Sequence, residues 1–349
     1  MERFNYLFLT LPFVAGTALA SLYPEMAFAG ALVCCFLLPV AFVLLLKKGQ
    51  RSLAIPLLFL CGMLVCWTSQ LLPIRREIPF AEQMLQTLRN TIGSLPLEGE
   101  QSSNLLLALL SGQKDALPRD IRSNFTKSGA AHLLALSGLH LGIVAAFFKA
   151  SLFFLGRSPA AKAARNCLVI AASGLYTIIC GASPSLVRAF IFVLFHSLGE
   201  LLPSRRCEPV PVLCYAACFQ LAANPSVISS LSFQLSYAAC MGIVLLFPLL
   251  KAFYPDEKGS IAAAVWTSIS MSLSCQAFTA PLVWLRFGTL PKYFLLTNLL
   301  ALPLCSLLVN VSIVALLLLP LPGPCGFLCR IVDRLALWLL QCLEIIAGM

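Results

Sequence analysis

Four polar residues in otherwise apolar surroundings could do chemistry: His132, Ser137, His140 and Arg188. The first three lie in the stretch AAHLLALSGLHLGIVAAFF, residues 130–148. Ser137 and His140 are three residues apart, so on a helix they share a face and can form a hydrogen bond. Such a pair could act as nucleophile and base in an intramembrane hydrolase. The sequence offers no obvious third, acidic group to orient the histidine, as a catalytic triad requires.

The glycines of the same stretch allow two further interpretations. Gly138 and Gly142 form a G-x-x-x-G step, which lets a second helix approach closely while serine and histidine form hydrogen bonds across the contact. Alternatively, Gly138 interrupts the helix, and the N–H groups freed at the start of the half-helix face an anion in a water-filled path. The residues alone leave packing and a broken helix both open.

Arg188 follows a second glycine- and proline-containing break, in GASPSLVRAFIFVLF. Ser185 lies in the first turn of the expected helix, and Arg188 lies one turn in. The arginine could extend its side chain to the membrane surface. It could instead face a lumen and hold a phosphate or carboxylate through its guanidinium group.

Other chemistries are absent from the sequence. There is no G-x-x-x-x-G-K-[ST] motif for ATP binding and no His/Asp cluster with metal-ligand spacing. Most of the 15 cysteines lie in apolar runs, where cysteine behaves as a small hydrophobic residue. We expect no carboxylate inside the spans, which disfavours an ion-coupled transporter. We therefore expect no catalytic residue, no metal and no cofactor, with the driving force supplied by a partner or a gradient.

The elements that position these residues are expected to be transmembrane helices. Of the 349 residues, 60% are hydrophobic and 11% are charged, and the mean hydropathy is +0.91. A soluble domain carries about 25% charged residues. We predict an all-α polytopic membrane protein with roughly 10–11 transmembrane helices, one or more of them broken or re-entrant. The predicted spans are 5–22, 26–46, 53–72, 131–155, 166–182, 185–202, 209–223, 227–250, 260–285, 294–319 and 327–347.

The Lys and Arg residues of the loops predict that the N-terminus lies inside and the C-terminus outside, provided that 209–223 crosses fully. Residues 1–20 could be a cleaved signal peptide, which would leave the rest of this topology unchanged. The net charge of +10 fits both the positive-inside bias and a polyanionic partner.

We predict three segments: N-terminal transmembrane helices over 1–73, an outer amphipathic linker over 74–103, and a transmembrane channel domain over 104–349. The linker includes AEQMLQTLRNTIGSL, whose apolar spacing predicts a helix lying on the outer face of the membrane. Two short helices are expected in SSNLLLALLSGQKDALPRDIRSNF, the first capped by a serine and the second with Pro118 in its first turn.

Several stretches together resemble the ComEC family of competence proteins. They are GAAHLLALSGLHLGIV, ASPSLVRAFIF, SSLSFQLSYAACMGI and QAFTAPLVWLRFGTLPKYFLLTNLLALPL, in the family's order and over roughly residues 104–320. The resemblance implies a channel in the cell inner membrane that takes up single-stranded DNA during natural transformation. It adds a second polar layer, formed by Gln234, Ser236, Gln276 and Asn298, to the expected DNA path. The residues expected to line that path are His132, Ser137, Gly138, His140, Gly142, Ser185, Arg188, Gln234, Ser236, Gln276 and Asn298.

The resemblance also implies partners. These are single-stranded DNA, the lipid bilayer, a cytoplasmic DNA-uptake helicase, and an outer DNA receptor or nuclease on separate chains; a homo-oligomer is left open. Compared with the family plan, this is expected to be a short form without the outer OB-type domain and the C-terminal metallo-β-lactamase-like domain. A permease for a small anion or a lipid precursor, and a Ser/His hydrolase, are the competing hypotheses.

Overall fold

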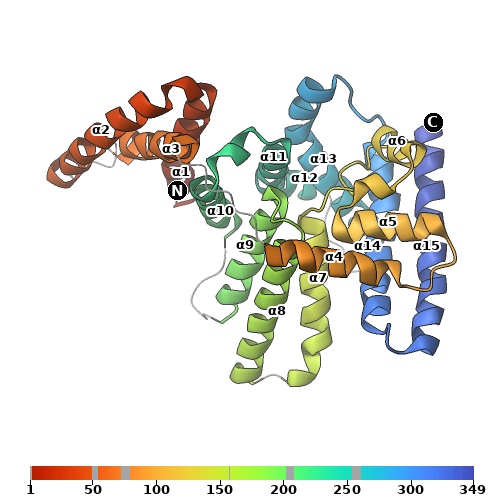
Figure 1. Cartoon of the computed structure of the whole chain (residues 1–349). Coiled ribbons are helices and arrows are strands. Elements are labelled where there is room, and N and C mark those ends of the chain that lie inside the picture. Colours follow the sequence, from red (N-terminus) through yellow and green to blue (C-terminus); the bar gives the residue numbers. More distant parts are fainter. Residues whose placement is uncertain (1, 49–53, 72–78, 157, 202–207, 254–260) are drawn as a thin grey trace. The chain divides into compact units, whose positions relative to one another are not determined.

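The computed structural model describes residues 2–48, 54–71, 79–156, 158–201, 208–253 and 261–349. Helices make up most of these ranges, and none of the residues described there lies in a strand (Figure 1). The α-helices are α1 (Glu2–Leu22), α2 (Ala27–Lys48), α3 (Ala54–Leu71), α4 (Pro79–Gly93), α5 (Glu100–Ser111), α6 (Arg119–Lys127), α7 (Gly138–Ser151), α8 (Pro159–Ile179), α9 (Pro184–Gly199), α10 (Pro209–Ala223), α11 (Leu231–Leu245), α12 (Phe247–Lys251), α13 (Ile261–Phe287), α14 (Phe294–Leu317) and α15 (Pro322–Gly348).

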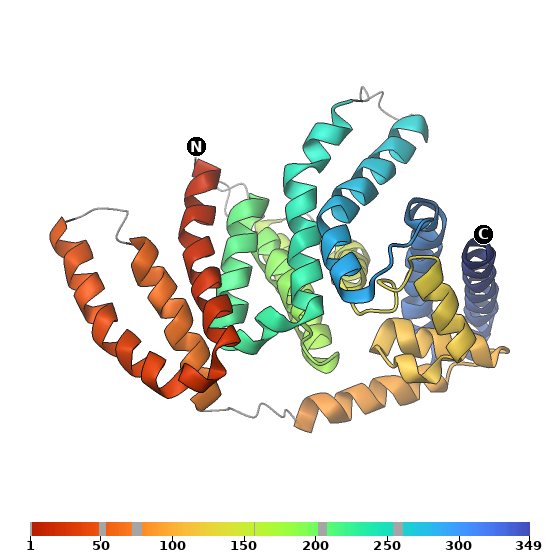
Figure 2. The ribbon, with the colours of Figure 1, turned by 90° about the horizontal axis from the view of Figure 1, so that it is seen from above.

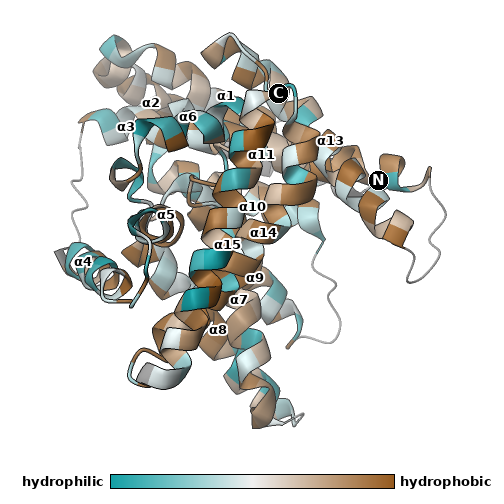
Figure 3. Ribbon diagram, turned by 90° about the vertical axis from the view of Figure 1, so that its right-hand side faces the viewer, coloured by the Kyte–Doolittle hydropathy of each residue, from teal (hydrophilic) through white to brown (hydrophobic). Residues whose placement is uncertain are grey.

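The predicted all-α polytopic membrane fold is confirmed. Each of the predicted spans coincides with one or two of these helices, and apolar residues dominate them (Figure 3). Among the described residues, five segments are long and apolar enough to cross a bilayer, namely Pro24–Ala41, Ala54–Leu71, Gly138–Leu155, Ile261–Phe287 and Phe294–Leu317. Four apolar segments of 10–17 residues are shorter: Tyr6–Leu22 within α1, and the whole of α9, α10 and α11. The two remaining predicted spans, 166–182 and 327–347, correspond to α8 and α15, which carry charged residues.

The chain forms two compact units. The first comprises residues 1–77 and 194–237, and the second comprises 78–193 and 238–349. These packing units divide the predicted segment 104–349, because residues 194–237 pack with the N-terminal helices.

In the first unit, α3 packs against both α1 and α2, which lie beside it in Figure 2. Glycines bring α1 and α3 into backbone contact: a Cβ on Gly16 would lie 2.0 Å from the carbonyl oxygen of Phe59, and one on Gly62 would lie 2.2 Å from that of Phe13. Thr17 adds a hydrogen bond from its hydroxyl to the Gly62 carbonyl, at 3.4 Å. Such contacts between small residues are a common basis of helix association in membranes.

In the second unit, the main hydrophobic core forms where α5 and α6 pack on α14 and α15. Helix α5 crosses the α14–α15 hairpin, whereas α7 and α8 run side by side (Figure 1). Gly99 precedes α5, so the predicted serine cap is wrong: Ser102 and Ser103 lie inside the helix. Pro118 directly precedes α6 as its N-cap residue.

Both ends of α5 are held by side chains from other helices. At its start, the backbone N–H of Glu98 donates to Oδ2 of Asp333 on α15, at 2.9 Å. At its end, the Tyr176 hydroxyl of α8 donates to the carbonyl oxygen of Leu110, at 3.1 Å. Helix α5 is therefore a structural part of the bundle rather than a segment attached to its surface.

Candidate DNA-path site

Helix α7 begins at Gly138, in the middle of the stretch that carries the two histidines. Ser137 is its N-cap residue, with extended backbone (φ −126°, ψ 175°), and its Oγ accepts from the N–H of Leu139 at 3.3 Å. In return, Nδ1 of His140 accepts from the Ser137 N–H at 3.4 Å, which completes a capping box. Residues 131–137 are not helical, so within the predicted span 131–155 the helix begins only at Gly138. A helix start at Gly138 agrees with the broken-helix alternative, whose water-filled anion path stays a prediction.

The packing alternative at this site is not supported. Gly142 is exposed, and nothing lies within 4 Å of the position a Cβ would take there. A Cβ on Gly138 would instead meet two atoms of α9 at 3.3 Å, the Ala189 Cβ and Nη2 of Arg188. The absence of a side chain at Gly138 therefore leaves room for the Arg188 guanidinium beside the start of α7.

Arg188 links three elements of the second unit. It lies on α9, its Nη2 is next to Gly138 at the start of α7, and its Nη1 contacts Sγ of Cys240 on α11. The side chain is half-buried and contacts protein groups, which argues against a side chain extended to the membrane surface. Cys240 was missed by sequence reasoning, because a cysteine in an apolar run gives no sign that it contacts an arginine.

The electrostatics at this point favour an anion. The first N–H groups of a helix lack intrahelical partners and carry the positive end of the helix dipole. Arg188 adds a permanent positive charge beside them. His140 is buried, with 1% of its surface exposed, and its Nε2 has no hydrogen-bond partner among the described residues. Ser137 Oγ and His140 Nδ1 lie 3.3 Å apart, but both atoms are engaged in the cap, and no acid in the described part of the chain orients Nε2 of His140.

The segment before α7 is held against α14. The Thr297 hydroxyl donates to the carbonyl oxygen of Ser128 at 2.6 Å, and Gly129 (φ +84°) packs on Pro291. His132 is exposed, with Nδ1 2.9 Å from the Gly129 carbonyl oxygen. Asn298, next to Thr297, has a buried Oδ1 with no hydrogen-bond partner among the described residues.

The remaining predicted residues are not shown to join this group. Ser185 and Gln276 are half-buried, in the first turn of α9 and on α13. Gln234 and Ser236 lie in the first packing unit, where the Gln234 side-chain amide donates to the carbonyl oxygen of Ile228 at 2.9 Å. The second polar layer stays a prediction.

One expectation about the spans is wrong. Asp333 is the seventh residue of the predicted span 327–347 and is 7% exposed, so a carboxylate is present within a span. Its signal in the sequence is its position between Arg330 and Arg334 in a mostly apolar helix. Within the described ranges, no three metal-ligating side chains come together.

Comparison with known proteins places the chain in a family. The family model described as Competence protein matches residues 109–349, more than half of the chain. The chain belongs to the competence protein family. The resemblance to ComEC proteins is thereby confirmed.

Among curated relatives of this competence protein, ComE operon protein 3 of Bacillus subtilis is 29% identical over 145 residues, which is 41% of this chain and 18% of the relative. Recombination protein 2 of Haemophilus influenzae is 27% identical over 251 residues, 65% of this chain and 29% of the relative. The uncharacterized protein YcaI of Escherichia coli is 25% identical over 249 residues, which is 69% of this chain and 32% of the relative. The chain thus spans at most about a third of these relatives. No solved structure matches it.

Proposed function

We propose that this competence protein conducts single-stranded DNA across the cell inner membrane during natural transformation. The observation that carries the proposal is the placement of Arg188 beside the start of α7, at a helix break inside apolar sequence. Arg188 and the N-terminus of α7 both attract an anion, and neither of them is a metal ion or a catalytic acid. A DNA backbone offers one phosphate after another to such a site.

The break explains how a polar path can exist in this fold. Backbone that is not helical is tolerated at membrane depth only where it is buried in protein or lines a water-filled cavity. The residues just before this segment are held by protein, since Ser128 accepts from the Thr297 hydroxyl of α14 and Gly129 packs on Pro291. The exposed His132 and the N-terminus of α7 then act as successive phosphate-facing groups.

We further propose that the chain is not an enzyme and that it works with partners on separate chains. A cytoplasmic helicase would pull the strand, and an outer receptor or nuclease would deliver it. The N-terminus would lie inside and the C-terminus outside. The broken helix and Arg188 would also suit a permease for a small anion or a lipid precursor, so the test must follow DNA itself.

The test compares Arg188→Ala with wild type in a transformable host that lacks its own copy. We expect loss of transformation and of labelled DNA in the cytoplasm, while membrane insertion and surface-bound DNA are unchanged. Arg286→Ala is the matched control, because Arg286 is exposed at the end of α13. Normal uptake by Arg188→Ala would remove the arginine from the path, and normal transformation of a deletion strain would favour the permease.

A further inference from the structure

A groove lies where the start of α5 meets α15, away from Arg188 and the start of α7. It has a volume of about 960 Å³. The α5 side contributes residues 98–102, and α15 contributes residues between Phe327 and Trp338. The groove includes Asp333, the buried carboxylate that holds the Glu98 N–H.

Two buried oxygen atoms in this groove have no hydrogen-bond partner among the described residues. They are Oδ1 of Asp333, whose residue is 7% exposed, and Oγ of Ser102, whose residue is 1% exposed. Both lie close to one point: a Cβ on Gly99 would be 3.2 Å from Ser102 Oγ and 3.6 Å from Asp333 Oδ1. A buried carboxylate oxygen without a donor is costly. Asp333 Oδ1 and Ser102 Oγ together therefore favour a ligand that donates hydrogen bonds and carries a positive charge.

The charges around this point have both signs. Arg330 and Arg334 are exposed and line the groove, as do the exposed Glu98 and Glu100. Together with Asp333, the lining has two positive and three negative formal charges. A polyanion such as DNA would be repelled by three of these five groups. A zwitterion can place its ammonium on the carboxylate and its phosphate on the guanidinium groups, each as a charge-assisted hydrogen bond.

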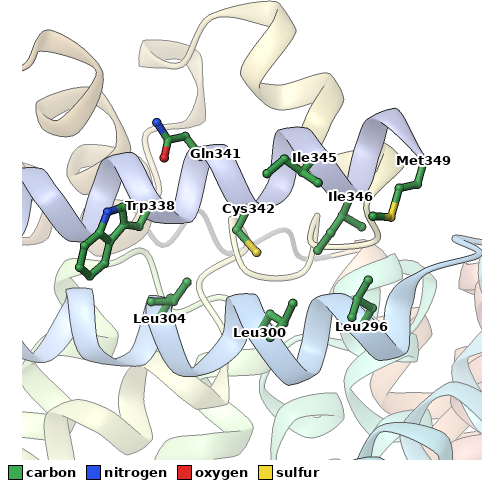
Figure 4. Close-up of a pocket in the computed structure, with 9 residues that line it drawn as sticks. All are labelled: Leu296, Leu300, Leu304, Trp338, Gln341, Cys342, Ile345, Ile346 and Met349. Atoms are coloured by element: carbon green, nitrogen blue, oxygen red, sulfur yellow. The ribbon is translucent and has the colours of Figure 1, made fainter.

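An apolar groove continues from the same place. Trp338 lines both the polar groove and a second groove of about 500 Å³ between α14 and α15. In Figure 4, Leu300 and Leu304 of α14 face Trp338 and Cys342 of α15 across this second groove. Such a lining suits a hydrocarbon chain and offers little to a water-soluble ligand.

We propose that the two grooves bind one phospholipid with a primary ammonium headgroup, of the phosphatidylethanolamine class. The ammonium donates to Asp333 Oδ1 and Ser102 Oγ, the phosphate accepts from Arg330 and Arg334, and an acyl chain lies between α14 and α15. This site is separate from the proposed DNA path and does not depend on it.

Native mass spectrometry of the full chain in detergent tests the proposal directly. The chain is offered equal amounts of phosphatidylethanolamine, phosphatidylcholine and phosphatidylglycerol with identical acyl chains. We expect phosphatidylethanolamine to be preferred about tenfold. The trimethylammonium group of phosphatidylcholine has no N–H, and phosphatidylglycerol has no cation. Equal occupancy by all three lipids, a preference for phosphatidylglycerol, or no bound lipid would each overturn the proposal.

Two variants separate binding from folding. Asp333→Asn keeps an acceptor for the Glu98 N–H but removes the charge. Gly99→Val fills the point between Ser102 and Asp333 at a position whose extended backbone (φ −103°, ψ 124°) valine readily adopts. Each should abolish the preference for phosphatidylethanolamine. Glu344→Gln, at an exposed position of α15 outside both grooves, should retain it. A folded Gly99→Val protein with unchanged selectivity would refute the assignment even if Asp333→Asn failed to fold.

Discussion

Nη2 of Arg188 lies 3.3 Å from the point where a Cβ on Gly138 would be, so the helix break and the arginine occupy one site. A Cβ at Gly138 would already be in tight contact with the guanidinium and with Ala189, so a larger side chain must displace one of them. Gly142 lies one turn further along α7, and no atom lies within 4 Å of the position that a Cβ would take there. Two glycines four residues apart on the same helix thus have different roles.

Substituting these two glycines tests the relationship. Gly138→Leu should reduce DNA uptake to the level of Arg188→Ala, because the new side chain displaces the guanidinium from the start of α7. Gly142→Leu should leave uptake unchanged, since Gly142 is exposed. Transformation frequency, normalised to the amount of protein in the membrane, is the measurement. Similar losses in both variants would show that the glycines act together, as in helix packing.

Ser137 should matter as a cap and not as a nucleophile. Ser137→Ala removes the acceptor for the Leu139 N–H and should lower the free energy of unfolding by about 0.5–2 kcal/mol. Ser137→Asn retains a capping oxygen, has no hydroxyl, and should support nearly normal uptake. Ser137→Asp also caps, but its negative charge beside Arg188 should repel phosphate and reduce uptake.

The Ser137 series also tests the hydrolase hypothesis. If Ser137 were a nucleophile, Ser137→Asn would be inactive, and wild type would react with a serine-directed probe at that residue. Membrane fractions of wild type and Ser137→Ala, labelled with a fluorophosphonate and analysed by peptide mass spectrometry, give the answer. We expect the same labelling in both.

Among the described glycines of the second unit, Gly242 should be the most sensitive to an added side chain. A Cβ on Gly242 of α11 would lie 2.1 Å from the Ser274 carbonyl oxygen on α13, a contact between two backbones that cannot relax by moving a side chain. Gly242→Ala should therefore lower the melting temperature in detergent. Gly326→Ala, on α15 with nothing within 4 Å, should not lower it. Equal melting temperatures would mean that α11 and α13 do not approach so closely.

The Tyr176 hydroxyl should contribute to stability through α5. Tyr176→Phe removes its hydrogen bond to the Leu110 carbonyl and should lower the free energy of unfolding by about 1 kcal/mol. Tyr215→Phe is the control, because the Tyr215 ring stacks on Phe195 and the substitution keeps the ring. Denaturant unfolding followed by circular dichroism gives both values. A larger effect of Tyr215→Phe would contradict the assignment.

The helices could be predicted because hydropathy is a local property. Spans such as 53–72 and 209–223 match α3 and α10 within a few residues, and apolar runs of that length have few other stable forms in lipid. The sequence also indicated that a helix could begin at Gly138, since this glycine follows a serine and precedes a histidine by two residues. It could not choose between a break and a packing step, because both use the same glycines.

The remaining contacts depend on partners distant in sequence. Asp333 accepts from Glu98 across 235 positions, and Arg188 contacts Cys240 across 52. No local pattern identifies either pair. Close contacts between a glycine and the backbone of another helix likewise occur at Gly16, Gly62 and Gly242, none of which belongs to the G-x-x-x-G step at Gly138 and Gly142. Packing in three dimensions decides which glycine is a contact and which is open space.

The attachment of α5 at both ends has a mechanical consequence. The helix has 12 residues, about 18 Å at the usual rise of 1.5 Å per residue, and a helix does not stretch under modest force. With Asp333 holding its start and Tyr176 holding its end, α5 acts as a rigid spacer between α15 and α8. A motion that parts α8 from α15 must first release one of these two hydrogen bonds, whereas a tilt of both helices together leaves both intact.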